Sequence, residues 1–383
     1  MTENFKGPAY PAARTIASTA REHFARRISA ARARGHEGLA EEPDAAAIET
    51  IIDAAFWASL RREEGYSPKI SLAFLPPGRM GSALRFERRL PLDPVLLARV
   101  AAAVERPGIH LGVWRDAEGL CAWGTTRDVP PLCFVLEVVA PGLLVIKYRR
   151  GREAGKYVNV AVLEGDSVRV VDERGTSLPD CPELLTRLLG FGAPEPVPDT
   201  VNVLVQLAAS MRTHGRGGSL LVVPQGSDGW RESIVHPVPY AAQPAYSELA
   251  DLMRREAAER ATTLWQESLI DAVEMVAGLT AVDGAALISD LYEVLAFGTK
   301  IVRRKGGEQV ERVVLTEPVI GDTAAVVNPV QLGGTRHLSA AQFVQDQQSA
   351  VALVASQDGR FTVFAWSPCE GMVHAHRVET LLL

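Results

Sequence analysis

The sequence predicts an α/β protein of two domains, and three features of the chain support this. Its 383 residues are enough to build two hydrophobic cores. Prolines stand at 194, 196 and 198, a density that is typical of a linker. After these prolines, apolar runs of strand length alternate with helical patterns, as expected for a mixed sheet flanked by helices. We therefore predict domains at 1–191 and 199–383, joined by a linker at 192–198.

The first domain is predicted to be α+β. Ile16, Phe24 and Ile28 recur at helical spacing, and a second helix begins after Asp44, whose carboxylate can cap its free amides. From 69 to 178 short apolar runs are separated by turn residues. The segment 164–166, Glu-Gly-Asp, is typical of a hairpin turn between two of these runs. Nothing in this region indicates a reaction.

The second domain is predicted from the same two patterns, apolar alternation and helical spacing. Its expected elements, in chain order, are a helix over 201–214, a strand over 219–223, a helical stretch over 244–279, a strand headed by Asp283, a hairpin at 305–307, a helix from Ser339, and strands over 350–355 and 361–366. This order favours a mixed sheet flanked by helices.

Composition limits the classes of partner. The net charge of −6 argues against a general nucleic-acid binder, which needs a basic face to neutralise phosphates. No apolar run reaches the ~18 residues that a membrane-spanning helix requires. The four cysteines fit no zinc spacing and are expected to be free thiols. We therefore expect a cytoplasmic protein with neither a membrane nor a nucleic-acid partner.

The strongest local signal for chemistry is Gly333-Gly334-Thr335-Arg336-His337, followed by a helix. Glycines allow a ligand to approach the backbone, and a helix N-terminus offers unpaired amides and a partial positive charge. Threonine adds a hydroxyl, arginine a planar fork suited to phosphate, and histidine a further donor or metal ligand. This combination indicates an anion site, and a tight turn is the alternative interpretation.

A second signal is Asp283-Gly284-Ala285 at the head of an apolar strand. An aspartate in this position can hold a divalent metal ion or accept a proton from a hydroxyl group. We expect the glycine beside it to leave room for a ligand. Asp-Gly is also a common turn, which is the alternative interpretation.

Together the two segments resemble the signature motifs of the diadenylate cyclase family, Asp-Gly-Ala and Gly-Thr-Arg-His-Arg. The surroundings are similar too: a helix and the strand Gly-Gly-Ser-Leu-Leu-Val-Val at 217–223, in the place of the family's Gly-Gly-Leu strand, precede the first motif, and a helix, an apolar strand ending at Ser356 and a short hairpin follow the second. The resemblance covers about 199–370. It implies the diadenylate cyclase fold for the second domain, with the first domain as a regulatory or sensor-type domain.

The resemblance also implies an activity, the condensation of two ATP molecules into the second messenger cyclic di-AMP with release of pyrophosphate, with Mg²⁺ or Mn²⁺ as cofactor. Two ATP sites must face each other, so a homodimer or a higher homo-oligomer is expected. The resemblance assigns Asp283, Arg336 and His337 to catalysis, with Asp283 and His337 near the metal. The residues assigned to nucleotide binding are Gly284 and Ala285 at the ribose and phosphates, Thr335 at the triphosphate with Gly334 beside it, Ser339 and Ser356 at the flanks of the nucleotide, and Leu295 or Phe297 against the adenine.

Two positions depart from the family pattern. Leu338 replaces the second arginine of Arg-His-Arg, and Gln357 replaces the acidic residue after the serine that ends the strand, with Asp358 adjacent. We expect these changes to slow turnover more than they weaken ATP binding. They also favour the alternative function, a catalytically weakened cyclase-fold module that senses ATP or a cyclic nucleotide.

Two further groups of residues are expected to lie on the surface without a role. His374 and His376 could share one face of a strand as a metal pair, but we expect them to be surface histidines. Arg303, Arg304 and Lys305 are expected to form the solvated tip of a hairpin.

Overall fold

The computed structural model describes residues 9–63, 65–78, 83–117, 119–149, 157–172, 202–235, 245–260 and 262–383. The chain divides into two compact units, residues 1–171 with residue 383, and residues 172–382. The predicted linker at 192–198 lies outside the described residues. Both units combine helices with a mixed β-sheet, so the α/β class is confirmed.

The first unit pairs helices with a sheet whose described strands have the order β2-β4-β3-β1-β5-β6-β7-β8. The β1–β3 pair is parallel and the other neighbours are antiparallel. Its helices are α1 (Pro11–Ala33), α2 (Ala45–Ser59) and α3 (Pro94–Val100), and its strands are β1 (Ser71–Phe74), β2 (Leu84–Pro91), β3 (His110–Asp116), β4 (Gly119–Thr126), β5 (Phe134–Ala140), β6 (Leu143–Arg149), β7 (Tyr157–Glu164) and β8 (Ser167–Val170).

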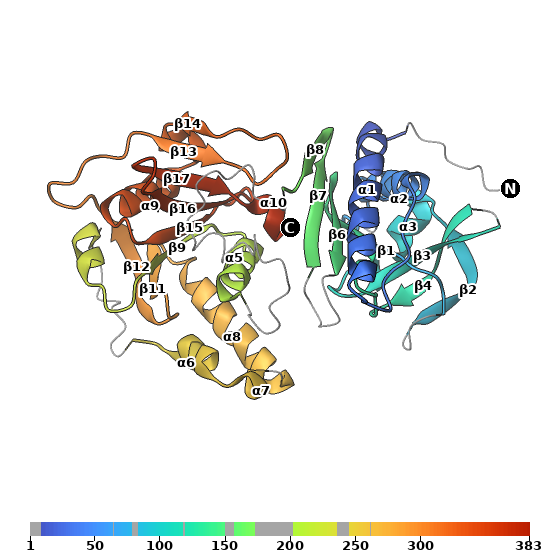
Figure 1. The fold of residues 1–383 in the computed structure, drawn as a ribbon, viewed down its shortest axis with the longest axis horizontal. Coiled ribbons are helices and arrows are strands. Elements are labelled where there is room, and N and C mark those ends of the chain that lie inside the picture. The colour runs from blue at the N-terminus through green and yellow to red at the C-terminus, as the bar shows by residue number, and fades with distance from the viewer. Residues whose placement is uncertain are drawn as a thin grey trace. The chain divides into compact units, whose positions relative to one another are not determined.

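Local signals decide several of these boundaries. The Asp44 carboxylate accepts a hydrogen bond of 2.8 Å from the amide of Ala47 and caps α2 as predicted. Asp93 caps α3 in the same way. The predicted turn at 164–166 joins β7 to β8. The apolar faces of α1 and α2 pack on one face of the sheet (Figure 1) and form a continuous core with β1, β5 and β6.

The second unit contains a sheet with the described strand order β10-β12-β11-β9-β15-β16-β17-β13-β14. Its helices are α5 (Val203–Thr213), α6 (Glu248–Arg254), α7 (Ala257–Arg260), α8 (Thr263–Leu279), α9 (Thr335–Asp346) and α10 (Glu379–Leu382), and its strands are β9 (Gly218–Val223), β10 (Ile234–Val235), β11 (Ala285–Ser289), β12 (Val294–Ile301), β13 (Val313–Thr316), β14 (Ala325–Val327), β15 (Val351–Ala355), β16 (Phe361–Ser367) and β17 (Met372–Arg377).

Two hydrophobic cores lie on opposite faces of this second sheet. One is formed with α5, α6 and α8, and the other with α9. Figure 1 shows α5 and α8 on one side of the strands. The second unit is therefore a three-layer arrangement in which the central strands β9, β11 and β15 are buried along their whole length.

Three predicted elements differ from the structure. The helical stretch over 244–279 is three helices. The first ends because Arg255 adopts an extended backbone. The Arg260 guanidinium donates hydrogen bonds to the carbonyls of Met253 and Arg255 at this break. The helix expected from Ser339 begins at Thr335. The residues at 305–307 form a turn but not a β-hairpin, since β12 and β13 are separated in the sheet by other strands.

Candidate functional site

Three segments of the second unit meet at one edge of its sheet. Strands β9 and β11 are parallel, with Leu220 opposite Ala286, so the residues that precede them, Gly217 and Asp283, come to the same edge. Strand β15 runs in the opposite direction and pairs Ala355 with Gly218, so Ser356 follows at this edge. The register therefore places Asp283, Gly217 and Ser356 in this order along one edge, with Gly217 in the middle.

Arg336 joins this edge from α9. Its Nη1 atom lies 3.1 Å from the position that a Cβ atom on Gly217 would occupy, and the Cγ atom of Gln357 lies 3.3 Å from the same point. Gly217 also has a φ of +72°, which favours glycine. Because Gly334 caps α9, Thr335 and Arg336 are in its first turn, where backbone amides are unpaired. The two predicted motifs thus converge on one sheet edge.

Asp283 presents a free carboxylate at this edge. Its side chain is 91% exposed, and the nearest cation among the described residues is Lys300, with 3.9 Å between Nζ and Oδ2. An ion pair of this length and exposure contributes little to stability. The carboxylate is therefore available to a metal ion, a hydroxyl proton or a second molecule.

Gly284 does not open space for a ligand, contrary to the prediction. A Cβ atom at this position would lie 2.6 Å from the carbonyl carbon of Gly298 and from the oxygen of Thr299. Its φ is +119°, a value that side chains rarely allow. Glycine is required here by the backbone of β12. Ala285, which follows it, is buried in β11.

Gly334 has the property that was expected of Gly284. It has an ordinary negative φ of −73°, and no atom lies within 4 Å of the place that a Cβ would take. Gly333 beside it is different, because its Cβ would lie 2.5 Å from Nδ1 of His337. The open backbone at the start of α9 is thus at Gly334, next to the exposed Thr335.

His337 lies behind this opening and is 2% exposed. Its ring packs edge-on against Phe364, with 6.1 Å between centroids, and its Nε2 atom has no hydrogen-bond partner among the described residues. Burial lowers the pKa of His337 below its usual range. The arginines at 377, 360 and 336 lower that pKa further, and Asp358 opposes them. His337 is therefore a neutral ring with one unpaired nitrogen.

The described residues hold no cluster of three or more histidine, cysteine, aspartate or glutamate side chains suited to a metal ion. A Mg²⁺ ion commonly takes one or two protein carboxylates and completes its shell with water and substrate phosphates. Asp283 fits that pattern. The Nε2 atom of His337 is unpaired but buried, so Asp283 is the accessible donor of the two. The donor set is compatible with a metal shared with a ligand but not with a closed structural site.

A pocket of about 360 Å³ adjoins this edge on the α9 face. It is lined by Ile301, Arg303, Gln309, Leu338, Ser339 and Gln342. Since Ala285 pairs with Thr299, continuing the antiparallel register brings Ile301 opposite Asp283. Leu295 packs with the core on the α9 face, whereas Phe297 packs with the core of α5 and α8. Leu295 is therefore the member of that pair on the α9 face, but it lies six residues along β12 from Ile301 and does not line the pocket.

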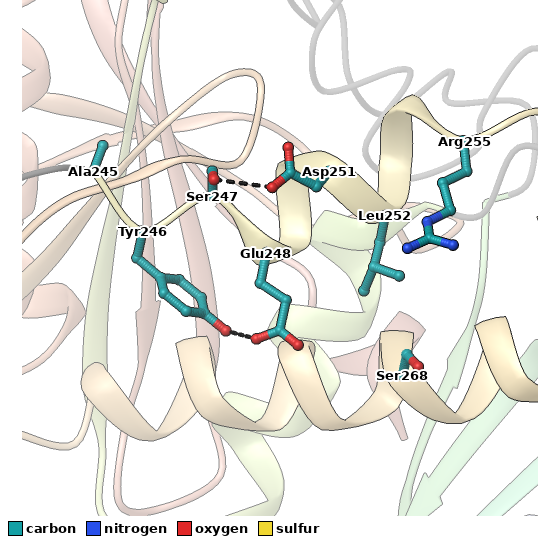
Figure 2. A pocket seen from close by; sticks show the side chains of 8 residues that line it. All are labelled: Ala245, Tyr246, Ser247, Glu248, Asp251, Leu252, Arg255 and Ser268. Carbon is teal, nitrogen blue, oxygen red and sulfur yellow. Dashed lines mark hydrogen bonds between the residues drawn. The ribbon is translucent and has the colours of Figure 1, made fainter.

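A larger pocket of about 560 Å³ lies elsewhere, between α6 and α8 (Figure 2), and contains none of the predicted residues. Figure 2 shows its polar side chains bonded to one another: the Tyr246 hydroxyl donates to Glu248, and the Ser247 hydroxyl donates to Asp251 over 3.0 Å. Its wall has two carboxylates, of Glu248 and Asp251, against one guanidinium, of Arg255, and this balance disfavours an anion. We therefore place the candidate site at the Asp283–Arg336 edge.

His374 and His376 are not on the surface, contrary to the prediction. Both are at most 1% exposed on β17. Nε2 of His374 lies 3.0 Å from Glu370, and Nδ1 of His376 lies 2.6 Å from the Thr316 hydroxyl on β13. Their alternate spacing does put both rings on one face, 5.6 Å apart, but each has a fixed partner from the surrounding fold.

Sequence reasoning missed Gly217, Lys300 and Arg303 as neighbours of the site. The sequence indicates Gly217 only as the start of the strand segment at 217–223, because its contact with Arg336 depends on a helix that begins 118 residues later. Arg303 was set aside with its charged neighbours, and no periodic pattern distinguishes it from them. Among the helices in the described ranges, none is both long and apolar enough to cross a membrane.

Comparison with known proteins bears on the first unit. Residues 37–127, which run from before α2 to the end of β4, match a family model described as "Probable sensor domain DACNV". No curated protein matches the chain. The first unit therefore contains a segment similar to a probable sensor domain.

Proposed function

We propose that the second unit is a diadenylate cyclase, which joins two ATP molecules into cyclic di-AMP under control of the sensor-type first unit. The observation that carries the proposal is the meeting of Asp283 and Arg336 at one sheet edge, although 53 residues separate them in the chain. The open backbone at Gly334 and the adjoining pocket add room for a nucleotide.

In this proposal the start of α9 holds the phosphates. The unpaired amides of its first turn and the Arg336 guanidinium both favour a bound anion. Ser339 adds a hydroxyl at the wall of the adjoining pocket. Neutral His337 acts as a hydrogen-bonding or metal-binding group and not as a cation.

The reaction forms one bond and breaks one bond in each half. The 3′-oxygen of one ATP attacks the α-phosphorus of the other, the bond from that phosphorus to the bridging oxygen breaks, and pyrophosphate leaves. Asp283 orients the attacking hydroxyl and receives its proton directly or through water. A divalent metal held by Asp283 supplies electrostatic stabilisation of the charge on phosphate when bound. The second half repeats the step and closes the ring.

Two copies of the chain are needed, because each site holds one ATP. The exposure of Asp283 supports an arrangement in which the sheet edges of two copies face each other. The reacting atoms would then be positioned by both copies, and the effective concentration of one nucleotide near the other would be high. The proposed partner is thus a second copy of this chain.

The test is incubation of the full chain with ATP and Mg²⁺ or Mn²⁺, followed by mass spectrometry for cyclic di-AMP. Asp283→Asn is expected to reduce the rate by at least ~100-fold. Asp271→Asn is the matched control, because Asp271 is an exposed aspartate on α8 and the substitution removes the same charge. Equal rates for wild type and Asp283→Asn would remove Asp283 from the mechanism.

The second candidate is a module that binds ATP or a cyclic nucleotide without turnover. Leu338 favours it, since it puts an apolar side chain in the first turn of a helix that would bind phosphates. The match of 37–127 to a probable sensor domain is also compatible with it. Saturable ATP binding by calorimetry, with no product at any metal concentration, would select this function over the cyclase.

A further inference from the structure

The 360 Å³ pocket beside α9 is suited to an anion. Of its six lining residues, Arg303 is charged, Ser339, Gln309 and Gln342 are polar, and none is acidic. Leu338 and Ser339 belong to the first turns of α9, so the partial positive charge of the helix start lies at the same wall. A cavity with a guanidinium, a hydroxyl and no carboxylate favours a phosphate group.

The backbone around Arg303 is fixed by hydrogen bonds on both sides. The amide of Val302 donates to the Ser233 carbonyl over 2.9 Å, and the amide of Arg304 donates to the Asp346 carboxylate over 2.8 Å. Asp346 lies at the end of α9, so this loop is tied to the same helix that carries the candidate site. The backbone that carries Arg303 is thus held in place before a ligand arrives.

Gln342 adds a second tie between the loop and α9. Its side-chain amide donates to the carbonyl of Glu308 over 3.0 Å and accepts from the amide of Val310 over 3.0 Å. Gln342 is 8% exposed, and it lines the pocket together with Arg303. The helix, the loop and the pocket therefore form one connected structure.

Arg303 differs from its neighbour Arg304 because, among the described residues, it forms no ion pair. Arg304 forms an ion pair of 2.7 Å with Glu232. In the part of the chain that the structure describes, Arg303 has no carboxylate within ion-pair distance, and its side chain is exposed beside the pocket. An unpaired guanidinium at the wall of a cavity can bind a ligand without first breaking an ion pair.

Leu338 and Arg303 line the same pocket, so an apolar side chain from α9 lies there together with a cation from the loop. Leu338 also packs against the apolar core on the α9 face. Arg336, in contrast, extends toward Gly217 on β9. The start of α9 thus has one guanidinium over the sheet edge and a second, from the loop, at the pocket next to Leu338.

We propose that this pocket binds the phosphate chain of a nucleoside triphosphate and that Arg303 is a phosphate-binding residue of the site. The inference rests on the proposed nucleotide-binding function and names a residue and a subsite that the function alone does not. Arg303 provides, from the loop that follows β12, the cation that Leu338 does not provide from α9.

The test is calorimetric titration of the full chain with ATP in Mg²⁺ and, separately, with adenosine. Arg303→Ala is expected to weaken ATP binding by ~10–100-fold, the range for loss of a charge-assisted contact, and to change adenosine binding by less than about twofold. Lys305→Ala is the matched control, since it removes the same charge from the same loop but does not line the pocket. It is expected to leave ATP affinity within about twofold.

The outcomes separate this inference from the proposed function. If wild type binds ATP and Arg303→Ala binds it equally well, Arg303 is not a phosphate ligand, while the nucleotide site stands. If the variant loses affinity for ATP and adenosine alike and melts at a lower temperature, its role is structural and the inference is wrong. If wild type binds neither ligand, the proposed function fails and the phosphate assignment fails with it.

Discussion

Replacing Gly284 with alanine is expected to destabilise the second unit strongly. The new Cβ would lie 2.6 Å from the carbonyl carbon of Gly298 and 2.6 Å from the oxygen of Thr299, and both atoms belong to the backbone of β12. They cannot move apart without disturbing the pairing of Ala285 with Thr299. Crowding of this kind costs about 1–3 kcal/mol, and a side chain at a φ of +119° costs about 1–3 kcal/mol more.

The free energy of unfolding of Gly284→Ala should therefore fall by roughly 2–6 kcal/mol. Urea unfolding, with hydrogen exchange of peptides from β11 and β12, measures this loss in the unit concerned. Gly306→Ala is the control: its φ is +78°, but nothing lies within 4 Å of its Cβ position, so it has the strain without the crowding. Equal losses of stability in the two variants would refute the packing explanation, because crowding against β12 would then add nothing to the backbone strain. The original prediction, that Gly284 leaves room for a ligand, would then stand again.

Three further predictions concern the anion site, assembly and acid sensitivity. Arg336→Ala should weaken ATP binding by about 1.5–3 kcal/mol, measured by calorimetry, and unchanged affinity would contradict the anion-site interpretation. Specific activity should rise with protein concentration in the range where monomers associate, and a fully active monomer would contradict the face-to-face arrangement. Burial lowers the pKa of His376 to about 3. Below pH ~6.5 this histidine is therefore protonated in the unfolded chain but stays neutral in the folded chain. His376 should therefore contribute a drop of about 2 kcal/mol in the free energy of unfolding of the second unit between pH 7 and pH 5, measured by urea titration, and His376→Gln should remove this part of the slope.

Local chemistry made much of the fold predictable. The Asp44 cap, the turn at 164–166 and the strand at 218–223 each depend on residues that are neighbours in the sequence. The candidate site was predictable for a related reason. Asp283 stands directly before a buried strand and Arg336 at the start of a helix, so both face the end of an element and not its interior.

Contacts distant in the sequence explain the features that could not be predicted. A His-Ala-His alternation indicates a shared face but says nothing about what covers it, and Thr316, which bonds His376, is 60 residues away. Gly284 was assigned to a ligand because the sequence does not show that β12 lies against it. The loop after β12 was expected to be a solvated hairpin tip, since the sequence does not reveal that Gln342 and Asp346 bind it to α9.

The relation between Leu338 and Arg303 allows a final prediction. Both line one pocket, so an arginine introduced at 338 would place a second guanidinium beside the first. In the wild-type background Leu338→Arg should change ATP affinity little, because the gain of a phosphate contact is offset by repulsion between the two cations and by lost packing of Leu338. In the Arg303→Ala background the same change should restore most of the lost affinity, since the pocket then contains one guanidinium from either source.

A double-mutant cycle measures this dependence directly. The coupling energy between the two positions should be at least about 1 kcal/mol, within the range found for residues that share a site. Gln357 is left unchanged in the cycle, because its side-chain amide donates to the Arg216 carbonyl and its Cγ atom lies near Gly217 beside Arg336. A carboxylate there would draw Arg336 away from phosphate and obscure the result. Strictly additive effects of Leu338→Arg and Arg303→Ala would show that the two side chains do not bind the same phosphate. Arg303 would then not replace the cation that is missing at Leu338, and the slow turnover expected from Leu338 would not be offset by this loop.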